Sequence, residues 1–219
     1  MITPDAAPPV RPVDGASAPI LTPDVKPVMI NKSVKKYKCI YADPPWDKNV
    51  FWNESFSTTY PRMPIEQIIA MGPQIREICA PDAHLWMWAV AGWLKPAITV
   101  AEAWGFVESD FVFWAHDWMR MGKVRHQGEI LMFFERGQMP LLSLEEINWE
   151  FTANWRGMHS EKPDALRKKV ERCSPGPRLE MFARRKPLGR EQEWDTWGND
   201  PGTKNDIELV VPFTLQGGR

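Results

Sequence analysis

The stretch Asp43-Pro44-Pro45-Trp46 directly follows the apolar run YKCIYA, which is typical of a short buried strand. Two successive prolines fix two φ angles and remove two backbone donors, so we expect a stiff corner whose carbonyl oxygens no local N–H masks. The Asp43 carboxylate and the Pro44 carbonyl oxygen then offer two converging hydrogen-bond acceptors, and the Trp46 ring offers a flat face beside them. Such a corner fits a planar amino group on an aromatic ring.

The exocyclic amine of adenine is one such group, and it is a poor nucleophile because its lone pair is delocalised into the ring. Two acceptors that bond its hydrogens favour a pyramidal nitrogen with a localised lone pair, while a tryptophan stacks on the base. This chemistry is preorganised stabilisation of a transition state rather than strict general-base catalysis. The structural alternative is a Pro-Pro turn with a buried aspartate cap.

The flanking sequence predicts strands that alternate with helices. Strands are expected over 37–42, 84–90, 111–115, 129–137, 147–153 and 179–185, and helices over 63–79, 94–106 and 159–173. The first helix begins at Pro64 and is disturbed at Gly72-Pro73, and the second is stopped by Gly105. This order favours an α/β sheet with helices on both faces and with ligands at the carboxyl ends of the strands, where Asp43 lies.

The third predicted helix has its own start signal and its own apolar face. Ser160 can cap it, and the chain enters it through Pro163. Leu166, Val170 and Cys173 fall on one face at helical spacing.

Length and composition limit the class of protein. The 219 residues fit one domain over 28–219, preceded by a flexible Pro-rich tail over 1–27 that contains seven prolines. No apolar run approaches the ~20 residues of a membrane helix and no secretory leader is visible, so a cytoplasmic protein without membrane contact is expected. The three cysteines, Cys39, Cys79 and Cys173, stand far apart, which indicates neither a disulfide framework nor a metal site.

Several motifs follow ADPPW in a fixed order: Tyr60 before MPIEQI, then HLWMWAV, AEAWGF, GEILMFFERG, HSEKPDALRKKVERCSPGPRLEMFAR and DTWGND. Together they resemble the MT-A70 family of adenine-N6 methyltransferases, over about residues 37 to 200. The resemblance implies a circularly permuted Rossmann-like methyltransferase fold with a central, mostly parallel sheet and helices on both faces. It also implies S-adenosylmethionine as cofactor.

The resemblance assigns roles residue by residue. Asp43, Pro44, Pro45 and Trp46 inherit the catalytic role, in contact with both the methyl donor and the target amine. The expected cofactor-binding residues are Asp43, Ser160, Lys162, Arg184, Asn199, Asp200, Asp24 and Val25. Among them Lys162 is expected at the cofactor's carboxylate, and Arg184 and Asn199 at its ribose and adenine. Glu180 either orients Arg184 or is a paired buried charge.

The target is expected to be adenine in DNA, in single-stranded, frayed or flipped form, because a paired base cannot present its amine to this corner. The loops DKNVFWNESFSTTY and WAHDWMRMGKVRHQ mix aromatic and basic residues and are the expected walls of the pocket. Their predicted substrate-binding residues, together with Trp46, are Trp52, Tyr60, Lys123, Arg125 and His126. For Tyr60, gating and packing are equally good interpretations.

Three alternatives stay open: an RNA adenine-N6 methyltransferase, an inactive nucleic-acid-binding subunit of a methyltransferase complex, and methylation of a protein side-chain amide. The formal net charge of -1 gives no general attraction to nucleic acid, so contact must come from local basic clusters. Too little chain remains for a separate recognition domain. We therefore expect short or relaxed sequence specificity, or recognition supplied by a partner such as a second copy or an accessory subunit.

Overall fold

The structure, a computed structural model, describes residues 35–47, 62–90, 92–120, 126–144, 147–148, 150–152, 161–186 and 193–212, with only the backbone for 116–120 and 126–127. All of these residues belong to one compact unit, Val34–Arg219. The tail predicted over 1–27, with Asp24 and Val25, lies outside the described residues.

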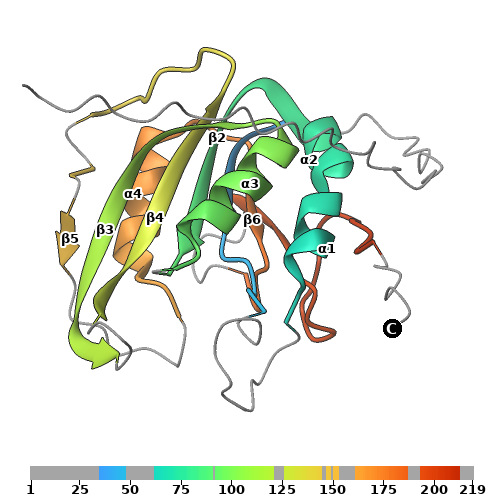
Figure 1. Ribbon diagram of the computed structural model, residues 1–219. Coiled ribbons are helices and arrows are strands. Elements are labelled where there is room, and N and C mark those ends of the chain that lie inside the picture. Colours follow the sequence, from blue (N-terminus) through green and yellow to red (C-terminus); the bar gives the residue numbers. More distant parts are fainter. Residues whose placement is uncertain are drawn as a thin grey trace, which may run out of the picture. The chain divides into compact units, whose positions relative to one another are not determined.

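Within the described residues, seven strands form one sheet in the order β5-β3-β4-β2-β1-β6-β7 (Figure 1). The strands are β1 (Tyr37–Ala42), β2 (Cys79–Ala89), β3 (Val107–Arg120), β4 (His126–Arg136), β5 (Glu150–Thr152), β6 (Arg178–Met181) and β7 (Trp194–Trp197). Strand β1 is parallel to β2 and β6, β6 to β7, and β3 to β5, whereas β4 is antiparallel to both of its neighbours. The expected mostly parallel sheet is confirmed.

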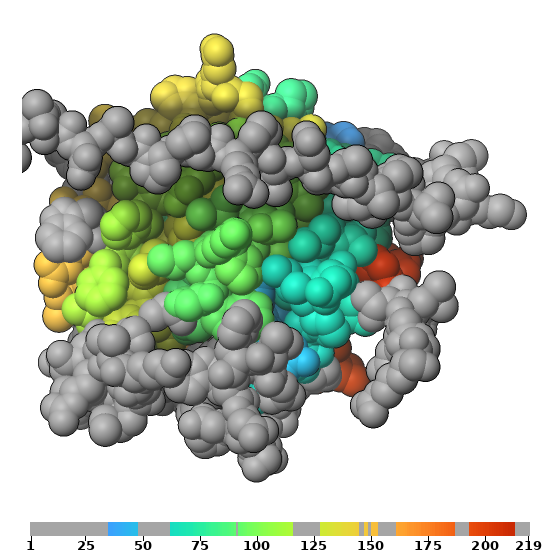
Figure 2. Space-filling view, viewed as in Figure 1, coloured from blue at the N-terminus to red at the C-terminus, as the bar shows by residue number. Residues whose placement is uncertain are grey.

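Helices cover both faces of this sheet, as the sequence predicts. The helices α1 (Ile65–Ala70), α2 (Gly72–Ile78) and α3 (Leu94–Trp104) lie on one face (Figures 1 and 2), and α4 (Asp164–Cys173) lies on the other (Figure 1). The break between α1 and α2 falls at Met71, just before Gly72-Pro73, as predicted. Gly105 ends α3 with φ 88°, a left-handed conformation that favours glycine.

Each face of the sheet has its own apolar core, because successive side chains of a strand point to opposite faces. In β1, Ile40 packs with the α1–α3 layer and Tyr41 with the α4 layer. The predicted apolar face of α4, Leu166, Val170 and Cys173, is fully buried. The three cysteines are buried and carry free thiols, in agreement with the sequence.

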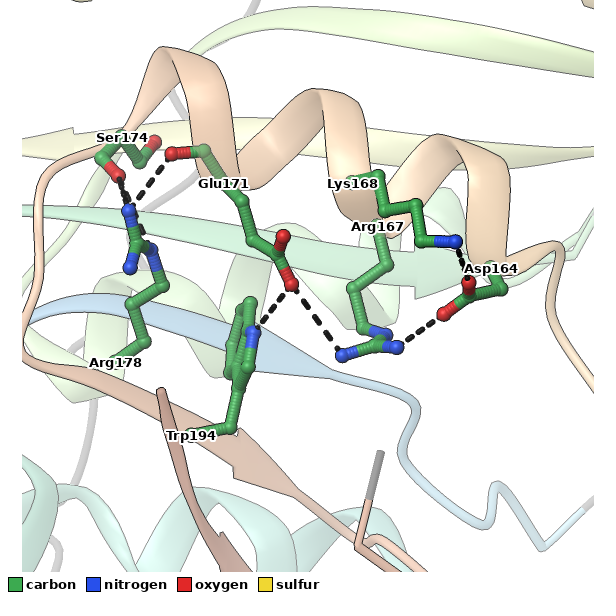
Figure 3. Close-up of polar contacts among 7 residues, drawn as sticks. All are labelled: Asp164, Arg167, Lys168, Glu171, Ser174, Arg178 and Trp194. Carbon is green, nitrogen blue, oxygen red and sulfur yellow. Dashed lines mark hydrogen bonds and ion pairs between the residues drawn. The ribbon is translucent and has the colours of Figure 1, made fainter. Parts of the chain in front are cut away.

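Polar contacts fasten α4 to the two strands below it (Figure 3). The Trp194 Nε1–H of β7 donates to Glu171 Oε1 over 2.7 Å, and Arg167 pairs with the same oxygen at 3.5 Å. Arg178 of β6 donates to the backbone carbonyls of Glu171 and Ser174 at 2.7 and 3.1 Å. The helix that follows the HSEKPD motif is thereby held over β6 and β7.

Two local predictions were wrong. Helix α4 has Pro163 in its N-cap position without a side-chain cap hydrogen bond, so it begins too late for Ser160 to cap it, and Ser160 itself lies outside the described residues. The sequence also predicts a loop over 114–127, yet β3 continues to Arg120 and β4 begins at His126, because the two strands pair as an antiparallel hairpin.

Strand β7 was not predicted, since its four residues WDTW are too few to show a period. No helix within the described residues is long and apolar enough to cross a membrane.

Candidate active site

The carboxyl ends of β1, β6 and β7 meet at one edge of the sheet, because these three strands are parallel neighbours. The Asp43 N–H donates to the carbonyl of Met181 over 3.4 Å, and the Ala183 N–H donates to the carbonyl of Trp197 over 3.0 Å. Residues that directly follow the three strands are therefore brought together from positions far apart in the chain.

The Pro-Pro corner has a hydrogen-bond pattern that differs from the prediction. The Trp46 N–H reaches back and donates to the Pro44 carbonyl over 2.8 Å, and the Met63 N–H donates to the Pro45 carbonyl over 2.9 Å. The expectation of unmasked carbonyls was therefore wrong, since the residue after the prolines supplies the donor that they lack. A carbonyl oxygen has two lone pairs, so the Pro44 oxygen can still accept a second hydrogen bond.

Trp46 lies beneath this corner rather than open to solvent. Only 6% of the residue is exposed, its ring stacks on Trp93 with the centroids 5.5 Å apart, and its Nε1–H donates to the Trp88 carbonyl. Trp93 covers one face of the Trp46 ring, and the stacking and the hydrogen bond together fix the orientation of the ring. Stacking of Trp46 on a target base stays a prediction.

A charged cluster connects the corner to strand β4. Lys162 Nζ lies 2.8 Å from Asp43 Oδ2, 3.3 Å from Glu129 Oε2 and 5.4 Å from the centroid of the Trp88 ring. The Lys162 and Glu129 side chains are 11% and 9% exposed, whereas that of Asp43 is 35% exposed. The carboxylate of Asp43 is thus the member of the cluster that solvent reaches most easily.

Burial acts to lower the pKa of Lys162, but the nearby carboxylates of Asp43 and Glu129 outweigh it, and the pKa is raised above its ordinary value. Lys162 therefore stays protonated at neutral pH and fixes both carboxylates. Sequence reasoning missed Glu129. The available signal was a carboxylate at the start of the apolar run ILMFF, since a charge there is buried only with a partner.

A small cavity of about 40 Å³ opens beside the corner. Its walls come from three strand ends: Asp43, Pro44, Pro45, Phe182, Arg184, Asn199 and Asp200. The structure thus brings together predicted catalytic residues and four of the predicted cofactor-binding residues, Asp43 being in both sets. The set combines carboxylate, amide and guanidinium groups with apolar proline and phenylalanine surface.

Phe182 is the wall residue that the sequence did not single out. It has φ 62°, in the left-handed region that non-glycine residues rarely adopt, so the chain turns sharply where β6 ends. Its ring lies against Trp104 and Trp197, with centroid separations of 6.4 and 5.4 Å. This anchored turn directs the next residues, including Arg184, along the cavity, and such strain is often found at functional sites.

Glu180 lies on β6 opposite Tyr41 of β1. Its Oε2 is buried and has no hydrogen-bond partner in the described part of the chain, so of the two interpretations the paired buried charge is wrong for this oxygen. Burial is the main cause that raises the pKa of Glu180 to about 7; Arg167 lowers it and Asp43 adds to the increase.

The remaining predicted site residues are not placed by the structure. Ser160, Trp52, Tyr60, Lys123 and Arg125 lie outside the described residues. For His126 only the backbone is described, and it pairs with Arg120 across the β3–β4 hairpin. Among the described residues, no group of three or more His, Cys, Asp or Glu side chains is placed to hold a metal ion.

Comparison with known proteins gives one family and two relatives. The MT-A70 family model matches residues 37–200. The type II methyltransferase M.MunI of Mycoplasma sp is 29% identical over 197 residues, which cover 79% of this chain and 82% of that protein. An N(6)-adenosine-methyltransferase MT-A70-like protein of Drosophila melanogaster is 26% identical over 191 residues, which cover 81% of this chain and 29% of that protein.

Proposed function

The chain belongs to the MT-A70 family of adenine-N6 methyltransferases, and we propose that it transfers the methyl group of S-adenosylmethionine to the N6 amino group of adenine in DNA. The observation that carries this proposal is the position of the Asp43 carboxylate, which belongs both to the Pro-Pro corner and to the wall of the adjoining cavity. A target amine and a methyl donor can therefore reach one point from two sides.

The residues of the cavity fit the cofactor chemically. The guanidinium of Arg184, the amide of Asn199 and the carboxylate of Asp200 match the hydroxyls and the ring edge of an adenosine, and Phe182 matches its apolar faces. S-adenosylmethionine supplies an electrophilic methyl group on a sulfonium when bound. For Lys162 we keep the predicted role at the cofactor's carboxylate, and its contact with Asp43 also positions the carboxylate at the corner.

The corner provides the acceptors for the amine. Asp43 and the second lone pair of the Pro44 carbonyl accept the two N6 hydrogens, which localises the nitrogen lone pair toward the cavity. In the transfer, a nitrogen–carbon bond forms, the carbon–sulfur bond breaks and the sulfonium becomes a thioether. The proton lost from N6 leaves through the carboxylate side of the corner to solvent, since Asp43 is the exposed member of the charged cluster.

DNA is favoured over RNA by the extent of the similarity. The match covers 82% of the type II methyltransferase, whereas it covers 29% of the adenosine methyltransferase from the fly. Short or relaxed sequence specificity, or recognition supplied by a second copy or another subunit, remains part of the proposal.

The test is to incubate the purified chain with methyl-labelled S-adenosylmethionine and either DNA or RNA of the same sequence, and to analyse the digested nucleosides by mass spectrometry. We expect labelled N6-methyl-2′-deoxyadenosine from DNA. Label in N6-methyladenosine from RNA alone would overturn the choice of DNA. Label in neither, with cofactor binding intact, would favour the inactive subunit.

A further inference from the structure

The residues after β7 fold back over the carboxyl end of β6 and then run beside α2. The Thr203 Oγ1–H donates to the Ala183 carbonyl over 2.9 Å, at the end of β6. Further on, the Gln74 side chain of α2 exchanges two hydrogen bonds with the backbone of Val210, of 2.8 and 2.9 Å, where the red C-terminal segment lies beside α2 (Figure 2). We call residues 198–211 the C-terminal strap.

The strap begins at a turn that is pressed against β6. A Cβ atom on Gly198 would lie 2.0 Å from the Ala183 carbonyl oxygen, so glycine is required here by close approach of the two backbones. Asn199 and Asp200 follow immediately and line the cavity. The position of Gly198 therefore determines where these two side chains meet a ligand.

One side chain holds both backbone groups of Gly198. The Gly198 N–H donates to Asn205 Oδ1 over 2.8 Å, and Asn205 Nδ2 donates to the Gly198 carbonyl over 3.1 Å. Gly198 is buried and Asn205 is exposed, so the amide lies over the turn from the solvent side. A buried peptide group needs such partners, and an asparagine amide supplies a donor and an acceptor in one plane.

We infer that Asn205 is a positioning residue for the cofactor cavity: its paired hydrogen bonds to Gly198 fix Asn199 and Asp200 in their binding geometry. This inference rests on the proposed function, since it assigns the cavity to S-adenosylmethionine. Asn205 itself does not line the cavity, so it acts through the turn rather than by touching the ligand.

Gln74 of α2 provides a matched control that contacts the same strap. Its side chain also makes two hydrogen bonds to the strap's backbone, both at Val210, which lies far along the strap from the Gly198 turn. Loss of either amide removes the same number of contacts from the strap, yet only Asn205→Ala releases the turn that carries the cavity wall. A general loosening of the strap would affect both variants alike.

The experiment measures binding of S-adenosylhomocysteine to the full chain by titration calorimetry for the wild type, Asn205→Ala, Asn205→Asp and Gln74→Ala, with thermal melting of each. We expect Asn205→Ala to raise Kd about tenfold, as loss of two neutral hydrogen bonds permits. Asn205→Asp keeps the acceptor for the Gly198 N–H and should fall between, and Gln74→Ala should change Kd less than about twofold while lowering Tm similarly. Hydrogen exchange of the unliganded chain should show faster exchange at residues 198–200 in Asn205→Ala only.

If the wild type binds the ligand, two outcomes overturn the inference alone. In the first, Asn205→Ala has the same Kd as the wild type; in the second, Gln74→Ala raises Kd as much as Asn205→Ala does. Failure of the wild type to bind the ligand overturns the proposed function and the inference with it. The exchange measurement and the wild-type titration thus separate the two failures.

Discussion

At the scale of single residues, Asp43 lies where the charged cluster, the Pro-Pro corner and the cavity meet. Asp43→Asn keeps the size of the side chain but replaces one acceptor oxygen by a donor, which opposes both the target amine and the Lys162 ammonium. We expect single-turnover methyl transfer to slow by about 100-fold or more, the usual effect of losing a preorganised transition-state contact. The cofactor Kd should change far less, because other residues provide most of the cavity wall.

Asp47→Asn is the matched control for that variant. Asp47 lies four residues further along the same corner and pairs with Arg62 at 3.8 Å, away from the cavity wall. It should keep near-wild-type turnover. Full activity in Asp43→Asn would remove the amine-binding role of the corner.

At the scale of elements, β6 carries a buried carboxyl group, that of Glu180, whose Oε2 has no hydrogen-bond partner among the described residues. Its pKa is about 7 in the folded chain against an ordinary value of 4.5, so between these values the folded state binds more protons than the unfolded state. The free energy of unfolding therefore falls as pH rises from about 4.5 to about 7 and is constant above that range as far as this group is concerned. Glu180→Gln should stabilise the chain by about 1–3 kcal/mol at pH 8 and have little effect near pH 4.5.

Urea denaturation of the wild type and Glu180→Gln at both pH values checks this prediction, with circular dichroism as the signal. A constant difference in unfolding free energy at the two pH values would show that Glu180 does not titrate in this range. A drop in stability at pH 8 would show that the ionised carboxylate has a partner in solution.

The elements also show what the sequence can and cannot predict. Apolar runs predicted the central strands, and Gly72-Pro73 and Gly105 marked helix ends, because these signals act within a few residues. The family motifs placed Arg184 and Asn199 with Asp43. Glu129 could not be placed with Lys162 in this way, since their meeting depends on β4 inserting between β2 and β3, an order that no local pattern encodes. The Trp46 N–H bond to Pro44 was missed for another reason: proline removes its own donor but does not prevent the next residue from supplying one.

At the scale of the whole molecule, the net charge of -1 limits how the chain can use the DNA backbone. Proteins that release many counterions from DNA carry a strongly basic face, whereas here several described cations already form ion pairs, among them Lys35 with Asp195 and Lys186 with Asp206. We therefore expect a small binding energy from phosphate contacts alone, with little of it available to unpair a base. Whether the target adenine is paired or unpaired should then limit the rate of the reaction.

We expect the rate of methyl transfer to depend on whether the target adenine is paired. In duplexes of one sequence, kcat/KM should be at least about tenfold higher when the target adenine lies opposite an abasic site than when it is paired with thymine, because unpairing costs a few kcal/mol. The same strand in single-stranded form should react at least as fast as the abasic duplex. Labelled methyl transfer at two salt concentrations provides the measurement, and the two duplexes should lose activity equally with salt because they offer the same phosphates. Equal kcat/KM for the paired and abasic duplexes would mean that the chain, alone or as an assembly, extracts the base with energy that the described residues do not account for.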